Sequence, residues 1–211
     1  SKTEHTTLAF VSLDEKGNRS FDFYRANSAD VMLRREEVPE ELLAGCKLFH
    51  FGSVSMTAEP ARDATLYAAR RAKELGKLVS YDPNFRSALW ADRDEAIQAM
   101  LTGLAFADIV KVSDDEVELL TGCRDFSEGA RSLVSGGAKL ALVTAGEQGT
   151  WYASVSGIEG HIPSIKVDAV DTTGAGDTFL GALLSGLLDY GRDLEGIPAV
   201  SYTHLTLPTN R

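Results

Sequence analysis

The run Asp171-Thr172-Thr173-Gly174-Ala175-Gly176-Asp177 combines small residues and acids at a spacing that could carry out chemistry. It follows the short apolar segment 167–170 and leads into 178–184, whose periodicity predicts a helix, so residues 174–176 should form a strand-to-helix turn. A helix N-terminus attracts anions through its free N–H groups and its dipole, and small residues let a phosphoryl group approach the backbone. Asp177 would then place a carboxylate beside that anion. The run therefore predicts phosphoryl transfer to a hydroxyl, which needs stabilised charge and a base.

Composition limits the classes of protein to consider. The chain has 211 residues, of which 44% are hydrophobic and 25% charged, as expected for one globular domain with a substantial core. A formal net charge of −10 argues against a nucleic-acid partner but not against a nucleotide held in a local site. The two cysteines, Cys46 and Cys123, are too few for a disulfide framework and lack metal-ligand spacing. With no apolar run long enough for a membrane span and no visible signal peptide, we expect a cytoplasmic protein without a membrane partner.

The elements that must position these residues follow an α/β pattern. Segments 7–12 and 20–24 read as a hairpin joined by turn residues 14–18. Four short apolar strands separated by helical segments are then expected, at 47–51, 77–81, 109–112 and 140–144. Gly-punctuated strands follow at 149–154 and 160–165. The fold class predicted is α/β, with a parallel sheet flanked by helices.

Local signals define two helices in the first half of the chain and the edge where a site should lie. A helix near 60–75 buries an Ala-rich face and ends at Gly76, and Asp92 caps the next helix. Ligands of parallel sheets bind beyond the carboxyl ends of the strands. The polar residues at such ends are Asp82, Ser113, Thr144 and Asp171.

Several separated stretches, together with residues 170–184, resemble the ribokinase-like (PfkB) sugar kinases, and most closely their fructokinase branch. The similarity runs in order from about residue 6 to about residue 198 and begins inside the family's lid, so the family's opening strand and Gly-Gly motif are missing. The stretches are Phe23-Tyr24-Arg25 with Ser28-Ala29-Asp30, Phe49-His50-Phe51-Gly52-Ser53, Ser80-Tyr81-Asp82-Pro83-Asn84-Phe85-Arg86 with Leu89-Trp90, and Val110-Lys111-Val112-Ser113-Asp114-Asp115-Glu116.

The resemblance implies a role for each matching residue. Asp177 would be the catalytic base, Gly174, Ala175 and Gly176 the anion hole, and Glu116 the acid that organises Mg²⁺ through water. Asp171 and Thr173 would bind a monovalent cation such as K⁺. Residues implied in binding ATP are Ser113, Thr144, Gly146, Gly149, Asn84 and Arg86, and Arg25 on the lid strand would touch the sugar.

Each of these residues also has a structural interpretation. Gly174–Asp177 can be a tight turn with a first-turn acid, and Ser113 can cap a helix over Glu116. The stretch 144–149 can be a hairpin turn with glycines at positive φ, and Asp171 and Thr173 can cap the helix at 174–188. Arg86 can form a surface salt bridge, and Arg25 can be solvated. The four histidines share no ligand spacing and are assigned to no metal: His5, His50, His161 and His204.

The function predicted is ATP-dependent phosphorylation of a sugar hydroxyl, with fructose to fructose 6-phosphate as the first choice. A 2-keto-3-deoxygluconate kinase or another PfkB sugar kinase is the alternative within the class. An inactive kinase fragment or kinase-like interaction protein is the alternative from another class. The cofactors implied are ATP, Mg²⁺ and K⁺, and the family also implies a homodimer through the lid.

The expected domain organisation is a partial PfkB kinase domain over 1–200, with lid strands at 1–30 and an α/β core at 45–200. The Thr-rich segment 201–211 lacks the small-residue helical pattern that the family places there. We expect it to be foreign to the fold.

Overall fold

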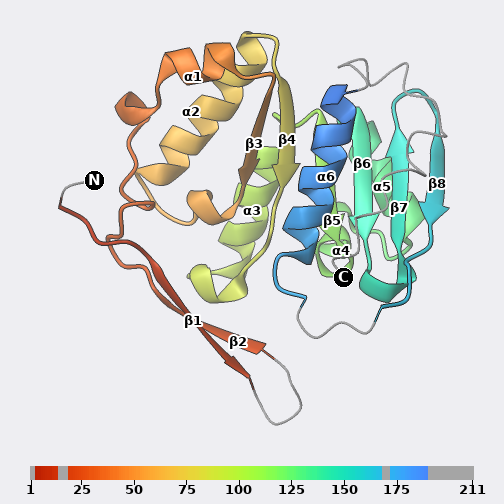
Figure 1. The fold of residues 1–211 in the computed structure, drawn as a ribbon, viewed down its shortest axis with the longest axis horizontal. Coiled ribbons are helices and arrows are strands. Elements are labelled where there is room, and N and C mark those ends of the chain that lie inside the picture. The colour runs from red at the N-terminus through yellow and green to blue at the C-terminus, as the bar shows by residue number, and fades with distance from the viewer. Residues whose placement is uncertain (1–2, 14–18, 168–171, 190–211) are drawn as a thin grey trace. The chain divides into compact units, whose positions relative to one another are not determined.

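The computed structural model describes residues 3–13, 19–167 and 172–189 (Figure 1). The predicted turn at 14–18, the predicted cation ligand Asp171 and the predicted foreign tail 201–211 lie outside these residues. The chain divides into two compact units, with the boundary between Phe106 and Ala107. The expected partition into lid strands and core stays a prediction.

The first unit begins with an antiparallel ribbon. Strands β1 (Leu8–Leu13) and β2 (Arg19–Tyr24) pair in a register that sets Leu8 opposite Tyr24, which confirms the predicted hairpin. The ribbon projects from the rest of this unit (Figure 1). Because two strands alone cannot bury both faces, large apolar side chains of the ribbon, such as Phe10 and Tyr24, are exposed.

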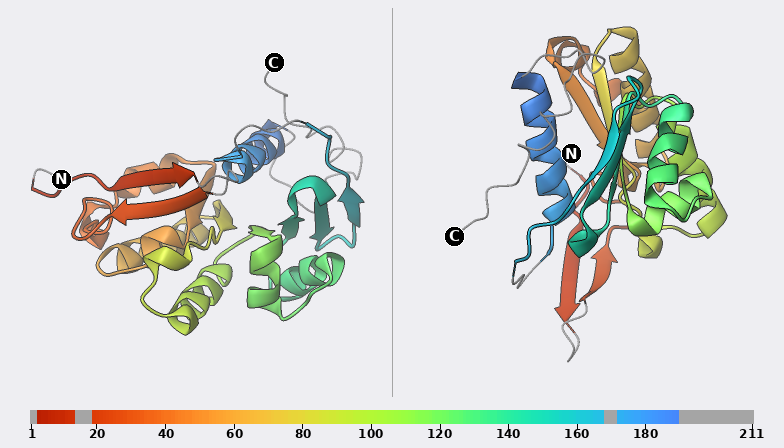
Figure 2. Two further views of the ribbon diagram at one scale, coloured as in Figure 1. Left: turned by 90° about the horizontal axis from the view of Figure 1, so that it is seen from below. Right: turned by 90° about the vertical axis from the view of Figure 1, so that its right-hand side faces the viewer.

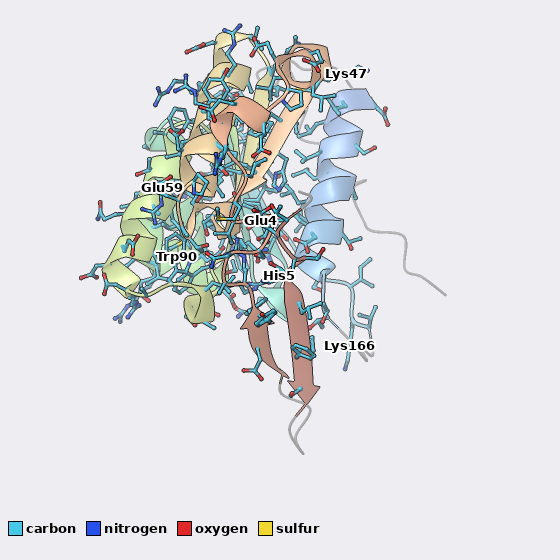
Figure 3. All side chains as sticks on the ribbon, turned by 90° about the vertical axis from the view of Figure 1, so that its left-hand side faces the viewer. Glu4, His5, Lys47, Glu59, Trp90 and Lys166 are labelled. Carbon is cyan, nitrogen blue, oxygen red and sulfur yellow. The ribbon has the colours of Figure 1, made fainter. Side chains whose placement is uncertain are left out.

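A polar cluster fixes the root of this hairpin. Arg25 donates from Nε to Asp30 at 2.8 Å, and Asp30 also accepts from Thr7 at 2.5 Å and from the buried Ser28 at 2.6 Å. Partial burial alone would raise the pKa of Asp30, but the hydrogen bonds from Ser28, Thr7 and Arg25 and the charge of Arg25 outweigh it and lower the pKa to about 2. His5, labelled in Figure 3 where the chain enters the hairpin, stacks on Tyr24 with ring centroids 4.7 Å apart. The cluster therefore ties both ends of the hairpin to one point.

The Asp30 cluster should make the stability of this unit depend on acid pH. Since the folded-state pKa lies below the ordinary value of about 3.9, the contribution of Asp30 is present above pH ~4 and is lost as pH falls towards 2. We expect Asp30→Asn to lower the free energy of unfolding at pH 6 and to match the wild type near pH 2. Urea unfolding across this range measures the difference. Asp22→Asn, which removes an exposed acid from β2, is the control. If the difference in free energy of unfolding between the wild type and Asp30→Asn stayed constant with pH, the assignment would be contradicted.

The rest of the first unit is two parallel strands with helices. Strands β3 (Leu48–Gly52) and β4 (Leu78–Asp82) pair in parallel, as predicted, and every residue of β4 is buried. Figure 1 shows α1 and α2 alongside this pair. The helices are α1 (Glu40–Gly45), α2 (Ala61–Glu74) and α3 (Arg93–Leu104), with 3₁₀ turns η1 (Arg35–Glu37), η2 (Val54–Met56) and η3 (Ser87–Leu89).

The local signals for these helices are confirmed. Gly76, just after α2, has φ +67°, the left-handed conformation of a helix-ending glycine. Asp92 caps α3 by accepting from the Glu95 N–H at 2.9 Å. The Ala-rich face of α2 is buried. Helix α3 packs closely on β4 at Gly103, where an added Cβ would lie only 2.6 Å from the Tyr81 ring. Small residues therefore bring these helices against the strands.

The second unit is a mixed sheet between helices. Strands β5 (Ile109–Ser113) and β6 (Leu140–Thr144) are parallel, whereas β7 (Thr150–Ser154) and β8 (Glu159–Ile162) continue antiparallel. Strand β8 ends just before Pro163, which lacks a donor for the ladder. The remaining elements of this unit are α4 (Asp114–Thr121), α5 (Phe126–Ser135), the 3₁₀ turn η4 (Gly146–Gln148) and α6 (Ala175–Asp189).

Figure 2 shows α6 on one face of this sheet and α4 and α5 on the other. The buried side chains of α6 are Leu180, Leu183 and Leu187, one stripe at helical spacing. The predicted helix at 174–188 is thus confirmed, and it covers the sheet. In the part of the chain that the structure describes, no helix is both long and apolar enough to cross a membrane.

Candidate functional site

The turn before α6 has the geometry expected from its small residues. Gly174 has φ +74°, and its carbonyl accepts from both the N–H and the Oγ1 of Thr178 at 2.8 Å. The N–H of Ala175 donates to Thr172 O at 3.1 Å, so this donor is engaged within the turn. Gly176 and Asp177 are in the first turn of α6, where N–H groups have no acceptor four residues back within the helix. The structure therefore brings the predicted anion-hole residues together at a helix N-terminus.

Asp177 lies over this turn and is exposed. Its Oδ2 is 3.9 Å from the position that a Cβ on Gly174 would take. The carboxylate is therefore next to the Gly174 turn, which is the predicted anion-binding turn. A base for an incoming hydroxyl needs this placement.

Gly176 has a neighbour from a strand more than 60 positions earlier in the chain. A Cβ on Gly176 would lie 3.1 Å from the Nζ of Lys111, on β5. Lys111 is 7% exposed, in a strand whose other members through Val112 are apolar and buried. The signal that could have found it is a single charged residue inside an apolar strand.

The carboxyl ends of β5 and β6 bring two further predicted residues side by side. Ser113 and Thr144 are register partners, and Thr144 Oγ1 donates to Val112 O at 3.3 Å. Glu116, 4% exposed in the first turn of α4, accepts from the Ser113 N–H at 2.8 Å. The Ser113 side chain in turn accepts from the Glu116 N–H, which completes the capping box predicted for this pair. The water-mediated Mg²⁺ role of Glu116 and the nucleotide contact of Ser113 stay predictions.

The segment 145–149 forms a tight turn between β6 and β7. Gly146 and Gly149 have φ of +49° and +94°, and the Ala145 N–H donates to Gly149 O at 2.9 Å. Gly149 lies so close to the end of β8 that a Cβ would collide with the Ile162 carbonyl oxygen. A Cβ on Gly146, by contrast, would meet nothing within 4 Å. The turn is therefore held on one side and open at Gly146, where a ligand could approach its backbone.

Side chains of β7 and β8 brace the same turn. His161 Nε2 lies 2.6 Å from Gln148 O, and the His161 ring stacks on Trp151 at 4.1 Å between centroids. Phe126 packs edge-on against Trp151 at 4.9 Å. His161 thus supports the turn.

Asn84 and Arg86 belong to the first unit, just after β4. Asn84 is left-handed, with φ +50°, and its N–H donates to Asp82 Oδ1 at 3.2 Å. The buried hydroxyl of Ser53, which follows β3, donates to Pro83 O in this loop at 2.5 Å. The sequence did not indicate this contact. Arg86 is exposed, and its Nη1 donates to Phe85 O at 3.2 Å. The loop is therefore held in a costly conformation of the kind found at binding sites, while its phosphate contacts stay predictions.

Arg25 is clamped within the first unit. Besides Asp30, its guanidinium donates to Thr57 Oγ1 at 2.5 Å and to Val54 O at 2.9 Å, so all three nitrogens have protein acceptors. The residue also lines a cavity of about 580 Å³. Other lining residues include Phe23, Asn27, Met32 and Leu89. Sugar contact by Arg25 stays a prediction, but the bonds assign it a structural role.

Metal binding can be considered only for the described residues. In ranges 3–13, 19–167 and 172–189, no three His, Cys, Asp or Glu side chains cluster closely enough to hold a metal ion. Thr173 is exposed just before the turn, and its predicted cation partner Asp171 lies outside these ranges. The monovalent-cation site stays a prediction.

The Gly-rich turn therefore opens a helix with an acid in its first turn, in a unit with helices on both faces of a sheet. Comparison with protein families shows to which family such a chain belongs. The model described as "pfkB family carbohydrate kinase" matches residues 1–199, and the chain belongs to this family.

Named relatives refine the comparison. The chain is 48% identical over 195 residues to "Probable fructokinase-2" of Arabidopsis thaliana, covering 92% of this chain and 59% of that protein. It is 49% identical over 191 residues to "Fructokinase-1" of Oryza sativa subsp. japonica, covering 90% and 59%. The chain thus spans about 59% of the length of these relatives.

Solved structures confirm the α/β fold class. A fructokinase with bound ATP from Xylella fastidiosa matches with a TM-score of 0.79 and 32% identity, covering 96% of this chain and 61% of that one. A fructokinase double mutant from Vibrio cholerae O395, in a form with fructose, ADP and potassium ion bound, matches with a TM-score of 0.81 and 30% identity, covering 95% and 64%.

Proposed function

We propose that this chain forms the phosphoryl-transfer part of an ATP-dependent sugar kinase, with fructose as the acceptor and fructose 6-phosphate and ADP as products. The observation that carries the proposal is the position of Asp177, over the Gly174 turn at the N-terminus of a 15-residue helix. Family membership and the fructokinase relatives support the same reaction.

In this reaction the sugar hydroxyl oxygen attacks the γ-phosphorus of ATP, and the bond between that phosphorus and the β,γ-bridging oxygen breaks. The Asp177 carboxylate takes the hydroxyl proton, and the bridging oxygen leaves with ADP. A carboxylate is a weak base for an alcohol, so the proton moves late, after much of the bond to ADP has broken. Positioning by the turn then matters as much as basicity.

The N–H groups of Gly176 and Asp177 would face the transferred phosphoryl group. They are fixed by the helix before any ligand arrives, and fixed donors stabilise developing charge without reorganisation. Gly174 lets the chain turn into the helix with φ +74°, and its lack of a Cβ leaves room beside the carboxylate.

The nucleotide side of the site would be the edge formed by Ser113, Thr144 and the turn with Gly146 and Gly149. Glu116 fits the Mg²⁺ role expected of it, because Mg²⁺ is held by few carboxylates and several waters. When bound, Mg²⁺ would neutralise charge on the phosphate oxygens. Asn84 and Arg86 would contribute to phosphate binding through amide and guanidinium donors, and Thr173 with Asp171 would hold K⁺.

An association of two copies through the β1–β2 hairpin is part of the proposal. The exposed apolar side chains Leu8, Phe10 and Tyr24 support it, since such a surface on a thin ribbon is typical of an interface.

Transfer of label from γ-³²P-ATP to a panel of sugars tests the function. The assay uses this chain and, in parallel, a chain extended to the full length of its relatives. The panel contains fructose, glucose, ribose and 2-keto-3-deoxygluconate. We expect fructose to be labelled at the highest kcat/KM. Preferential labelling of 2-keto-3-deoxygluconate would show that this sugar acid, and not fructose, is the acceptor. If neither chain labelled any sugar, the kinase-like interaction protein would be the better interpretation.

A further inference from the structure

The placement of Lys111 is unusual for a strand in the middle of a sheet. Ile109, Val110 and Val112 are all buried and apolar, yet Lys111 among them is 7% exposed. Burying an ammonium group costs several kcal/mol unless the surroundings stabilise the charge. A buried lysine therefore needs surroundings that hold its ammonium group in a fixed place.

The alternation of the strand places Lys111 on the face that α6 covers. Residues 109, 111 and 113 share one face of β5, and the Lys111 ammonium group reaches the first turn of α6 at Gly176. Gly176 lies four residues before Leu180 and so begins the buried stripe of this helix. At this position of the buried stripe α6 has a glycine in place of an apolar side chain. Lys111 Nζ lies in the space that such a side chain would fill.

We propose that Lys111 is a positioning residue for phosphoryl transfer, whose ammonium group lies behind the first turn of α6 and adds positive charge to the N–H groups facing the phosphoryl group. The inference rests on the proposed kinase function and extends it. During transfer, negative charge builds on the leaving oxygen and is spread over the three equatorial oxygens of the phosphoryl group. A fixed buried cation close to the turn therefore stabilises the transition state more than it stabilises bound ATP.

The proposal is tested by Lys111→Met, which keeps most of the length of the side chain and removes the ammonium group with its charge. We expect kcat to fall roughly 10- to 100-fold, with the KM for ATP and for sugar changed less than about 3-fold. The affinity for ADP with aluminium fluoride, a mimic of the transition state, should fall by the same factor as kcat, while the affinity for ADP alone is kept. Lys111→Arg, which keeps the charge, should recover most of the loss.

Lys139→Met is the matched control. Lys139 directly precedes β6, at the end of that strand away from Thr144, and its Nζ pairs with Asp108 at 3.5 Å. Its loss should leave kcat unchanged. Thermal unfolding of each variant separates a folding defect from a kinetic one, and Lys111→Gln replaces Lys111→Met if the latter does not fold.

Two results would overturn the assignment of Lys111. One is an active wild type whose Lys111→Met and Lys111→Gln variants have wild-type kcat with only a lower Tm. The other is an equal loss of affinity for ADP and for ADP with aluminium fluoride, which would show a general effect on nucleotide binding. An inactive wild type, by contrast, would overturn the proposed kinase function itself.

Discussion

Asp177→Asn is expected to lower kcat by roughly 10²–10⁴-fold, the usual cost of losing a general base. The amide keeps the size of the side chain and its position over the Gly174 turn but cannot take the hydroxyl proton. ATP affinity should stay close to that of the wild type, because the N–H groups of the turn are unchanged. Steady-state kinetics with fructose and ATP, together with calorimetric titration of ATP, measure both quantities.

Asp189→Asn is the control for this substitution, since it removes an exposed acid from the other end of α6. Its kcat should equal that of the wild type. If Asp177→Asn turned over at nearly the wild-type rate, Asp177 would be a helix-terminus acid and the base would lie elsewhere.

Gly149→Ala should cause the largest loss of stability among single substitutions near the candidate nucleotide turn. Gly149 has φ +94°, which a side chain disfavours, and the new Cβ would collide with the Ile162 carbonyl oxygen and lie 2.9 Å from the Ser164 N. Positive φ and overpacking against backbone together should cost roughly 2–5 kcal/mol. Urea denaturation measures the loss, and the KM for ATP should rise because the turn shifts.

Gly157→Ala separates the two causes. Gly157 also has positive φ, +80°, but a Cβ there would meet nothing within 4 Å. This variant should lose only about 1–2 kcal/mol and keep its KM for ATP. Equal losses in the two variants would mean that the contact with the chain after β8 does not constrain the turn.

Local signals in the sequence were enough to predict much of the fold. Strands such as β4 and β6 are short, mostly apolar runs. The end of α2 before Gly76 and the start of α3 after Asp92 depend only on residues within one helical turn. The Gly-rich turn and the helix after it were predicted because residues 174–184 combine small residues with an apolar periodicity. These features depend on neighbours along the chain.

The contacts that the sequence did not reveal join residues far apart in the chain. Arg25 meets Thr57, Ser53 meets Pro83, and Lys111 meets Gly176 only after the chain has folded. A sequence shows an arginine directly after a strand, but not that all three of its nitrogens will find acceptors. Likewise, nothing near Gly176 in the sequence indicates that a lysine from β5 fills the space beside it.

The most direct test of the central claim is to identify the product made from fructose and ATP by ³¹P NMR. The proposal predicts that the γ-phosphate signal of ATP is replaced by ADP and by one phosphomonoester resonance coupled to the C6 protons of fructose. It also predicts that Asp177→Asn leaves the ATP signals intact over the same time. Release of inorganic phosphate alone, or a phosphomonoester formed equally fast by Asp177→Asn, would contradict transfer to a sugar hydroxyl by this site.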